Sequence, residues 1–183
     1  MLLLCQFLAV FGGMSIIGHL VALLSDAGLD IQRASGALGL AILASVPGRL
    51  LFGWLADRLP KRYVLAAALL VHAVAMLFLF GIQSPGALPA FVIAFGLALG
   101  GAAVLMPLLV GECFGLVSFG KILGLIMLAA TLGAATGQVL TGWIFDLTGH
   151  YTIAFALHLT AFLAGAVLVC FLRPPRRAGA DVG

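Results

Sequence analysis

Long apolar runs separated by short polar turns make up most of this 183-residue chain. Each run holds roughly 20 residues, the length that an α-helix needs to cross about 30 Å of hydrocarbon. The ten-residue alternation of apolar and polar positions typical of a membrane β-barrel is missing, and lipid cannot satisfy the backbone hydrogen bonds of other structures. The pattern therefore predicts six transmembrane helices, at about 2–24, 36–56, 63–82, 88–110, 122–145 and 152–172.

The connections between these runs are short and rich in Asp, Gly, Ser and Pro, which are turn-forming residues. None is long enough for a domain outside the membrane. We expect one six-helix transmembrane domain over residues 1–172. Residues 173–183 include Pro174 and Pro175, which cannot continue a helix, and we expect them to form a disordered cytoplasmic tail.

Composition supports this class of protein, because 64% hydrophobic and 8% charged residues cannot give a soluble domain with a wettable surface. The lysines and arginines also predict the orientation. If Met1 lies in the cytoplasm, only Arg33 is in an outer loop, and seven basic residues are inside: Arg58, Lys61, Arg62, Lys121, Arg173, Arg176 and Arg177. This bias predicts a multi-pass protein of the cell (inner) membrane with both termini cytoplasmic. It also explains the net charge of +3 without a nucleic-acid partner.

Residues for enzymatic chemistry are not found in any recognisable pattern. The chain shows no nucleophile elbow, no phosphate-binding glycine loop and no carboxylate pair, so we expect neither an enzyme nor a cofactor. The cysteines Cys5, Cys113 and Cys170 lack the spacing of a metal site and are interpreted as packing residues. His72 and His158 are single residues in apolar runs, which favours hydrogen-bonded interior histidines, with a proton relay as the alternative.

A five-residue motif occurs twice in the chain. Gly53-Trp54-Leu55-Ala56-Asp57 ends the second run, and Gly142-Trp143-Ile144-Phe145-Asp146 ends the fifth run, 89 residues later. Three helices separate the two copies, so the copies face opposite sides of the membrane. An odd number of helices between copies indicates an inverted repeat of three plus three helices. The same offset aligns Arg49 with Gln138.

The turn after the second run resembles the loop signature of the major facilitator superfamily. That signature is a glycine, an aspartate four residues later and then a basic cluster, which match Gly53, Asp57, Arg58, Lys61 and Arg62. The chain has Pro60 where the family usually has a glycine, which alters the turn. The resemblance implies that the loop gates the cytoplasmic side, with Asp57 bound in one state and released in the other. The alternative is that Asp57 is an ordinary charge at a helix end.

Further motifs resemble the monocarboxylate and oxalate/formate antiporter branch of this superfamily, and in particular its C-terminal half. They are His19-Leu20-Val21, Asp26-Ala27-Gly28, Arg49 before the loop, Glu112-Cys113-Phe114-Gly115, Phe119-Gly120, and the run from Gly142 to Gly149. The likeness covers nearly the whole chain. It implies one six-helix half of a secondary active carrier that binds a small organic anion and works by alternating access. Such carriers bind substrate between two halves, so we expect a fragment, a half that pairs with a separate N-terminal half, or a homodimer.

Arg49 is the main candidate for binding the anion. A charge near mid-membrane costs about 2.5–3.5 kcal/mol on insertion scales, so it usually faces a cavity, a counter-ion or a substrate. Its guanidinium offers paired donors to a carboxylate, and the second run holds no acid, with Ser45 four residues before Arg49. This favours an anionic ligand. Some oxalate carriers of the family keep a lysine in the equivalent of the fifth run and this chain has none there, so the resemblance implies a monoanion rather than a dianion. The alternative is that Arg49 reaches the membrane surface or pairs with a carboxylate such as Glu112.

His19 and Gln138 complete the expected site. The resemblance implies that His19 faces the cavity, where it would contact the substrate or take up a co-transported proton. Exchange for a counter-anion would need no such group. A competing hypothesis is a non-transporting six-helix scaffold or partner subunit, in which Arg49 binds a partner's carboxylate, or an inactive truncated carrier. The lipid bilayer is the surrounding medium in every case.

Overall fold

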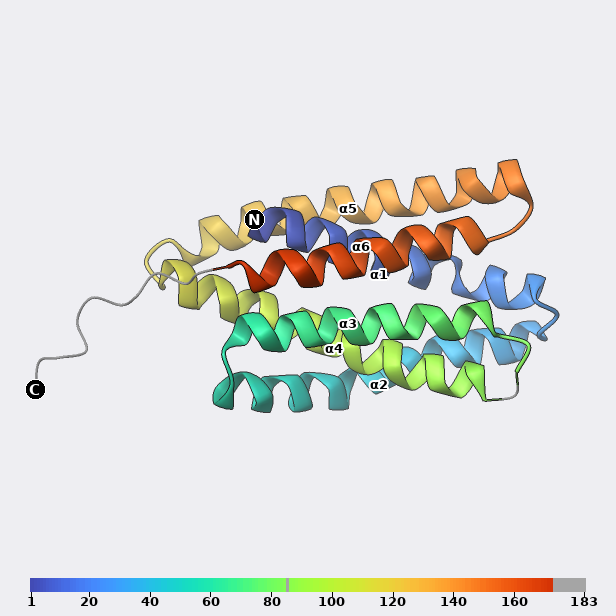
Figure 1. Cartoon of the computed structure of the whole chain (residues 1–183), viewed down its shortest axis with the longest axis horizontal. Helices are drawn as coiled ribbons and strands as arrows, with labels where there is room; N and C mark the ends of the chain where they lie inside the picture. The colour runs from blue at the N-terminus through green and yellow to red at the C-terminus, as the bar shows by residue number, and fades with distance from the viewer. Residues whose placement is uncertain (85, 173–183) are drawn as a thin grey trace, which may run out of the picture.

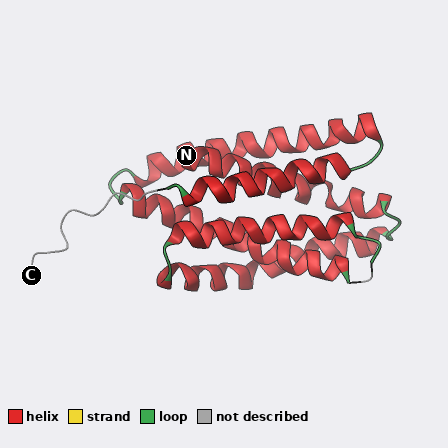
Figure 2. Ribbon diagram, in the orientation of Figure 1, coloured by secondary structure: helices red, strands yellow, loops and turns green. Residues whose placement is uncertain are grey.

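The structure, a computed structural model, describes residues 1–84 and 86–172, so the expected tail over 173–183 lies outside the described residues. The described residues form six helices and no strand (Figures 1 and 2). The helices are α1 (Leu2–Asp26), α2 (Ile31–Arg58), α3 (Lys61–Phe80), α4 (Ala87–Phe114), α5 (Phe119–Thr148) and α6 (Thr152–Cys170). All six are long and apolar enough to cross a membrane, which confirms the predicted all-α membrane class.

Local chemistry explains where several helices begin and end. Asp30 caps α2, because its carboxylate accepts a hydrogen bond of 3.1 Å from the Gln32 backbone N–H. The helix therefore begins at Ile31, before the apolar run that marked it in the sequence. Only Leu59 and Pro60 separate α2 from α3. The α5 helix ends at Thr148, and the next residue, Gly149, has a φ of 72°, in the left-handed region that glycine adopts without steric cost.

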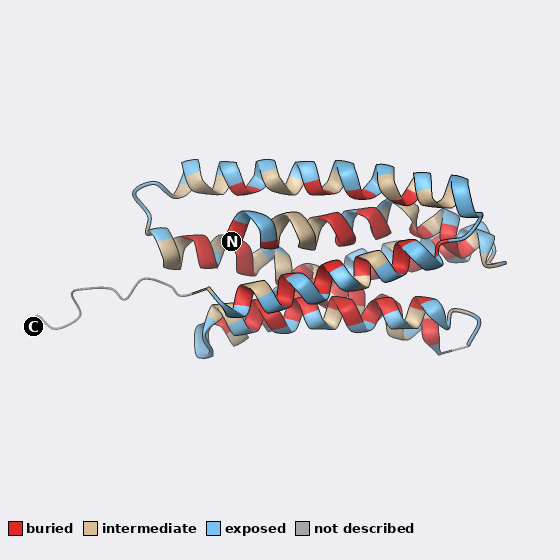
Figure 3. Cartoon of the chain, turned by 45° about the horizontal axis from the view of Figure 1, so that its top comes forward, coloured by how far each residue is buried: buried red, intermediate tan, exposed pale blue. Residues whose placement is uncertain are grey.

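The helices are arranged as an inverted repeat of α1–α3 and α4–α6 (Figure 1). The most extensive contacts are α2 with α4 and α5 with α1, which are equivalent pairs when the two repeats are exchanged. The contacts of α3 with α4 and of α6 with α1 are equivalent in the same way. The contact of α3 with α6 is its own equivalent, because the exchange converts each of these helices into the other. Figure 3 shows exposed positions along most of α5, and α2 is similarly exposed.

Glycines allow the two principal helix pairs to approach closely. A Cβ atom at Gly48 would collide with the Leu97 carbonyl of α4, and a Cβ atom at Gly137 would collide with the Phe11 carbonyl of α1. The same holds for three further glycines at these contacts, Gly96, Gly100 and Gly133. Lipid is as apolar as the side chains, so helices in a membrane associate mainly through such close packing and through hydrogen bonds.

The two ends of the bundle differ in charge. We call the end with Arg58, Lys61, Arg62 and Lys121 the basic end, and the end with Asp26, Asp30, Arg33 and Asp146 the far end. The basic end is the one that the sequence predicts to be cytoplasmic.

Candidate functional site

Arg49 lies on α2, nine positions before the last residue of that helix, Arg58. This is about 14 Å from the helix end at the rise of an α-helix. The residue is exposed and lies at the edge of the contact with α4, where a Cβ atom at Gly100 would come within 2.8 Å of the Arg49 backbone nitrogen. Within residues 1–84 and 86–172, no carboxylate oxygen lies within 4 Å of its guanidinium. Ser45, one turn away, donates its hydroxyl to Ile42 of its own helix (2.6 Å).

Glu112 pairs with a different cation. Its Oε2 atom lies 3.3 Å from Nζ of Lys61, so the end of α4 is tied to the first residue of α3. The same oxygen is buried and has no hydrogen-bond partner among the described residues, which makes the pair a charge contact rather than a well-directed hydrogen bond. The alternative in which Glu112 neutralises Arg49 is therefore not the arrangement in this structure.

His19 and Gln138 are brought together by the contact of α1 with α5. The Nε2 atom of His19 lies 3.1 Å from the backbone oxygen of Gln138. The Gln138 side chain packs over Gly18, because a Cβ atom at Gly18 would lie 3.3 Å from its Cδ atom. His19 is half-buried and Gln138 is exposed. Arg49 forms no hydrogen bond with either residue in the described part of the chain and belongs to the other principal helix pair.

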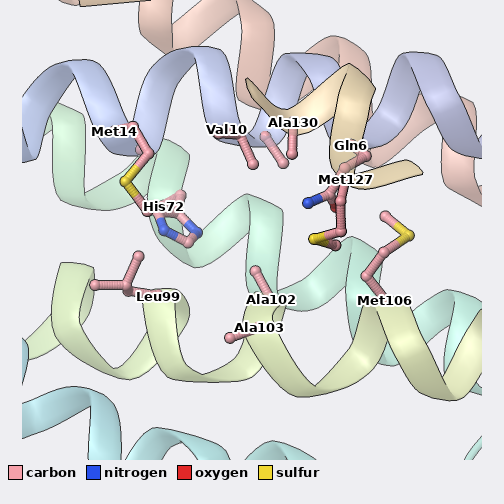
Figure 4. A pocket seen from close by; sticks show the side chains of 12 residues that line it. Gln6, Val10, Met14, His72, Leu99, Ala102, Ala103, Met106, Met127 and Ala130 are labelled. Carbon is pink, nitrogen blue, oxygen red and sulfur yellow. The ribbon is translucent and has the colours of Figure 1, made fainter. Parts of the chain in front are cut away.

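The structure also places a cavity of about 290 Å³ between α1, α3, α4 and α5 (Figure 4). Its walls are mostly apolar, and neither Arg49, His19 nor Gln138 lines it. The polar groups in its lining are the amide of Gln6 and the ring of His72. Gln6 was not among the expected site residues, although a single amide in an apolar run was a signal that could have indicated it.

His72 is held firmly at the side of this cavity. It is 2% exposed, its ring stacks on Phe162 with centroids 4.7 Å apart, and its Nδ1 atom lies 3.1 Å from the Ala68 carbonyl oxygen. Since a carbonyl only accepts, Nδ1 carries the hydrogen, and Nε2 of the neutral ring is a hydrogen-bond acceptor. The expected interior histidine is thus hydrogen-bonded and also lines a cavity.

The residues at the turn between α2 and α3, which the sequence predicts to form a gate, have separate surroundings. Asp57 is exposed in the last turn of α2 and forms no ion pair within the described ranges. The Arg58 guanidinium lies 3.9 Å from the centroid of the Trp54 ring, a cation–π contact. Arg62 donates from Nη1 to the Leu172 carbonyl at 2.7 Å, which links the start of α3 to the end of α6. Lys61 and Arg62 thus hold the turn against α4 and the end of α6, whereas Asp57 has no ion-pair partner among the described residues.

Aromatic rings cluster at the far end, around the turn between α5 and α6. Tyr151, in the turn before α6, stacks on Phe145 with ring centroids 4.4 Å apart. Burial raises the pKa of the Tyr151 hydroxyl, and the negative charges of Asp26 and Asp146 raise it further. The His19 ring lies 6.2 Å from that of Tyr151, so the His19–Gln138 contact lies beneath this cluster.

Comparison with known proteins identifies the class. The family model of the Major Facilitator Superfamily matches residues 2–183, and the chain belongs to this superfamily. This family membership and the six long apolar helices make it a multi-pass membrane protein. The chain is 32% identical over 169 residues to "Monocarboxylate transporter 13" of Bos taurus, covering 85% of this chain and 39% of that protein.

Other relatives carry similar names. "Monocarboxylate transporter 11" of Homo sapiens is 32% identical over 162 residues, with 82% of this chain and 34% of the relative covered. "Monocarboxylate transporter 12" of Mus musculus is 27% identical over 165 residues, with 87% and 34% covered. The chain thus spans between about a third and two fifths of the length of these relatives.

Proposed function

We propose that this chain is the C-terminal six-helix half of a carrier that moves a small organic monoanion, such as a monocarboxylate, across the membrane by alternating access. Two observations support the proposal. The relatives are named monocarboxylate transporters, and the chain matches only part of their length. The complete site would then lie between this half and an N-terminal half, or between two copies of the chain, in the cell (inner) membrane with both termini cytoplasmic.

The single observation that carries the proposal is the state of Arg49. Arg49 lies well inside α2, it is exposed, and no described carboxylate neutralises it. A planar guanidinium binds a carboxylate through two parallel hydrogen bonds, which is stronger and more selective than a single contact. One such cation without a second one beside it suits a monoanion better than a dianion. Arg49 is therefore the proposed carboxylate-binding residue.

The remaining expected residues take supporting roles in this proposal. Gln138 is the inverted-repeat counterpart of Arg49 and offers an uncharged hydrogen-bonding group to the substrate. His19, bound to the Gln138 backbone, is the candidate for a co-transported proton, whereas exchange for a counter-anion would not need it. The mostly apolar cavity beside Gln6 and His72 suits the hydrocarbon part of the substrate.

The basic-end loop is the proposed cytoplasmic gate. Asp57, Arg58, Lys61 and Arg62 lie at the point where α2 turns into α3, beside the ends of α4 and α6. Asp57 forms no ion pair with the described residues, which fits a gate that is released in this conformation. In the opposite conformation Asp57 would bind a basic residue or a helix end of the other half.

Uptake measurements test the assignment of Arg49. The chain is expressed alone and together with an N-terminal six-helix half of a carrier of this superfamily, and uptake of radiolabelled lactate into vesicles is measured. Arg49→Ala should reduce uptake at least about tenfold, because a charge-assisted hydrogen bond contributes that much or more. Arg33→Ala, on the same helix at the far end, is the matched control and should keep parental uptake.

Assembly separates this proposal from the alternative of a non-transporting scaffold. In a carrier, Arg49→Ala leaves co-purification of the two halves unchanged. In a scaffold whose Arg49 binds a partner's carboxylate, the same change reduces co-purification, and no variant supports uptake. Parental uptake by Arg49→Ala would disprove the anion-site assignment.

A further inference from the structure

A chain of buried hydrogen bonds connects α6, α5 and α1 within one helical turn of Gln138. The Nε2 atom of His158 lies 2.9 Å from Oγ1 of Thr141. Thr141 Oγ1 lies 2.7 Å from Oγ of Ser15, which in turn donates to the Gly137 carbonyl at 3.0 Å. Ser15 and His158 are fully buried and Thr141 is 2% exposed. Water therefore does not reach these hydrogen bonds and cannot compete for them.

The donors and acceptors in this series of hydrogen bonds follow from its last acceptor, the Gly137 carbonyl. A carbonyl only accepts, so the single hydrogen of Ser15 goes to Gly137. Thr141 must then donate to Ser15, and His158 must donate to Thr141 through Nε2–H. This is the only assignment that satisfies all three contacts, and it fixes the tautomer of the neutral His158 ring. Consistent with it, Nδ1 is buried without a partner among the described residues and carries a lone pair.

Among the described residues, no such hydrogen bonds are found at the equivalent place in the contact of α2 with α4. The position 89 residues before Thr141 is Phe52, and its ring packs on Gly101 of α4, where a Cβ atom would come within 2.5 Å of the ring. An apolar ring on a glycine is non-directional and tolerates small rotations of α2. Hydrogen bonds weaken steeply away from linearity, so Ser15 and Thr141 hold α5 at one rotation against α1.

This restraint acts on the segment of α5 that carries Gln138. Ser15 and His19 are one turn apart on α1 and contact the successive carbonyls of Gly137 and Gln138. We propose that Ser15, Thr141 and His158 are positioning residues, which set the rotation of α5 on α1 and thereby direct the Gln138 amide toward the substrate. The part of this inference that concerns substrate rests on the proposed function, whereas the restraint on α5 does not.

Thiol labelling tests the restraint without transport. Gln138→Cys is introduced after the three natural cysteines are replaced by alanine, and its reaction rate with a charged, membrane-impermeant methanethiosulfonate is measured. Adding Thr141→Val, which keeps the shape but removes two hydrogen bonds, should change the rate about fivefold. Thr141→Ser keeps the hydroxyl and should react like the parent. Thr136→Val is the matched control, because among the described residues the Thr136 hydroxyl bonds only to carbonyls of α5.

Transport kinetics test the link to substrate. With Gln138 intact, Thr141→Val should raise KM for lactate about fivefold while Vmax stays within twofold of the parent, and Thr141→Ser should restore KM. If Thr141→Val does not purify as a folded protein, Ser15→Ala is used in its place, because it interrupts the same series of hydrogen bonds. Parental labelling and parental KM in these variants would overturn the inference. If the parent itself does not transport, the proposed function fails, and the labelling rates still decide the restraint on α5.

Discussion

Gly48 and Gly137 make the same contact in the two inverted repeats, since each lies directly against a main-chain carbonyl of the neighbouring helix, that of Leu97 or that of Phe11. The two glycines are 89 residues apart, the offset of the repeated five-residue motif. The next residues, Arg49 and Gln138, therefore occupy equivalent places beside the two principal helix contacts. The repeat thus relates two of the expected site residues through backbone packing rather than through direct contact.

Substitution of the packed glycines should destabilise the bundle. Gly137→Ala adds a Cβ atom against the Phe11 carbonyl, which the helices can relieve only by separating, and we expect a loss of about 1–3 kcal/mol. Gly39→Ala is the matched control, because nothing lies within 4 Å of its added Cβ atom. That change should stabilise α2 slightly, since alanine favours a helix over glycine by about 1 kcal/mol or less. Thermal unfolding in detergent measures both, and equal melting temperatures would contradict the packing argument.

The contact between Lys61 and Glu112 should have a measurable but modest coupling energy. Both side chains are about a third exposed, at 28% and 32%, so solvent screens the pair. A double-mutant cycle with Lys61→Met and Glu112→Gln should give about 0.5–1 kcal/mol at low salt and less at high salt. A coupling energy that does not change with salt would show that packing, and not charge, joins the ends of α3 and α4.

Arg62 should protect the last turn of α6. Its guanidinium donates to the Leu172 carbonyl at 2.7 Å and also to the Tyr63 hydroxyl at 2.9 Å. Arg62→Ala removes both bonds, so amide hydrogen exchange at residues 168–172 should become several times faster. Arg58→Ala, which removes the cation–π contact with the Trp54 ring, is the control and should leave this exchange unchanged.

Tyr151 should make the stability of the protein fall at high pH. Its pKa is raised above the ordinary value of 10.0 by burial, and then by Asp26 and Asp146. A group with a raised pKa in the folded state contributes stability that is fully present below its unfolded pKa and is lost as the pH rises through the folded pKa. Relative to Tyr151→Phe, the parent should therefore lose stability above about pH 10. Chemical unfolding of both proteins from pH 8 to pH 11.5 provides the comparison, and parallel curves would contradict it.

The class of fold was predictable from the chain alone because lipid leaves so few choices. A run of about 20 apolar residues can only be a helix when the backbone must satisfy its own hydrogen bonds, and six such runs give six helices. The helix ends were less predictable, as α2 shows. Its first turn holds Gln32 and Arg33, which are polar, and the cap at Asp30 rather than hydropathy determines where it begins.

The candidate site was predictable only in part. Arg49 stood out because a charge in an apolar run is costly, and the family resemblance pointed to His19. The ion pair of Lys61 with Glu112 was not foreseen, since the two residues are 51 positions apart and are joined only when α3 packs on α4. Ser15 and Thr141 gave no signal at all, because small hydroxyl residues are common in membrane helices and bond equally well to their own backbone.

The sequence by itself determined the helices, their apolar surfaces and the repeat, because each depends on the hydropathy and spacing of neighbouring residues. Only the tertiary structure decided which polar groups meet: His19 with Gln138, Ser15 with Thr141 and His158, and Lys61 with Glu112. The physical reason is that these contacts depend on the rotation of each helix about its axis. Glycines such as Gly48 and Gly137 let the helices approach a distant backbone closely enough for these contacts to form, and hydropathy does not encode that approach.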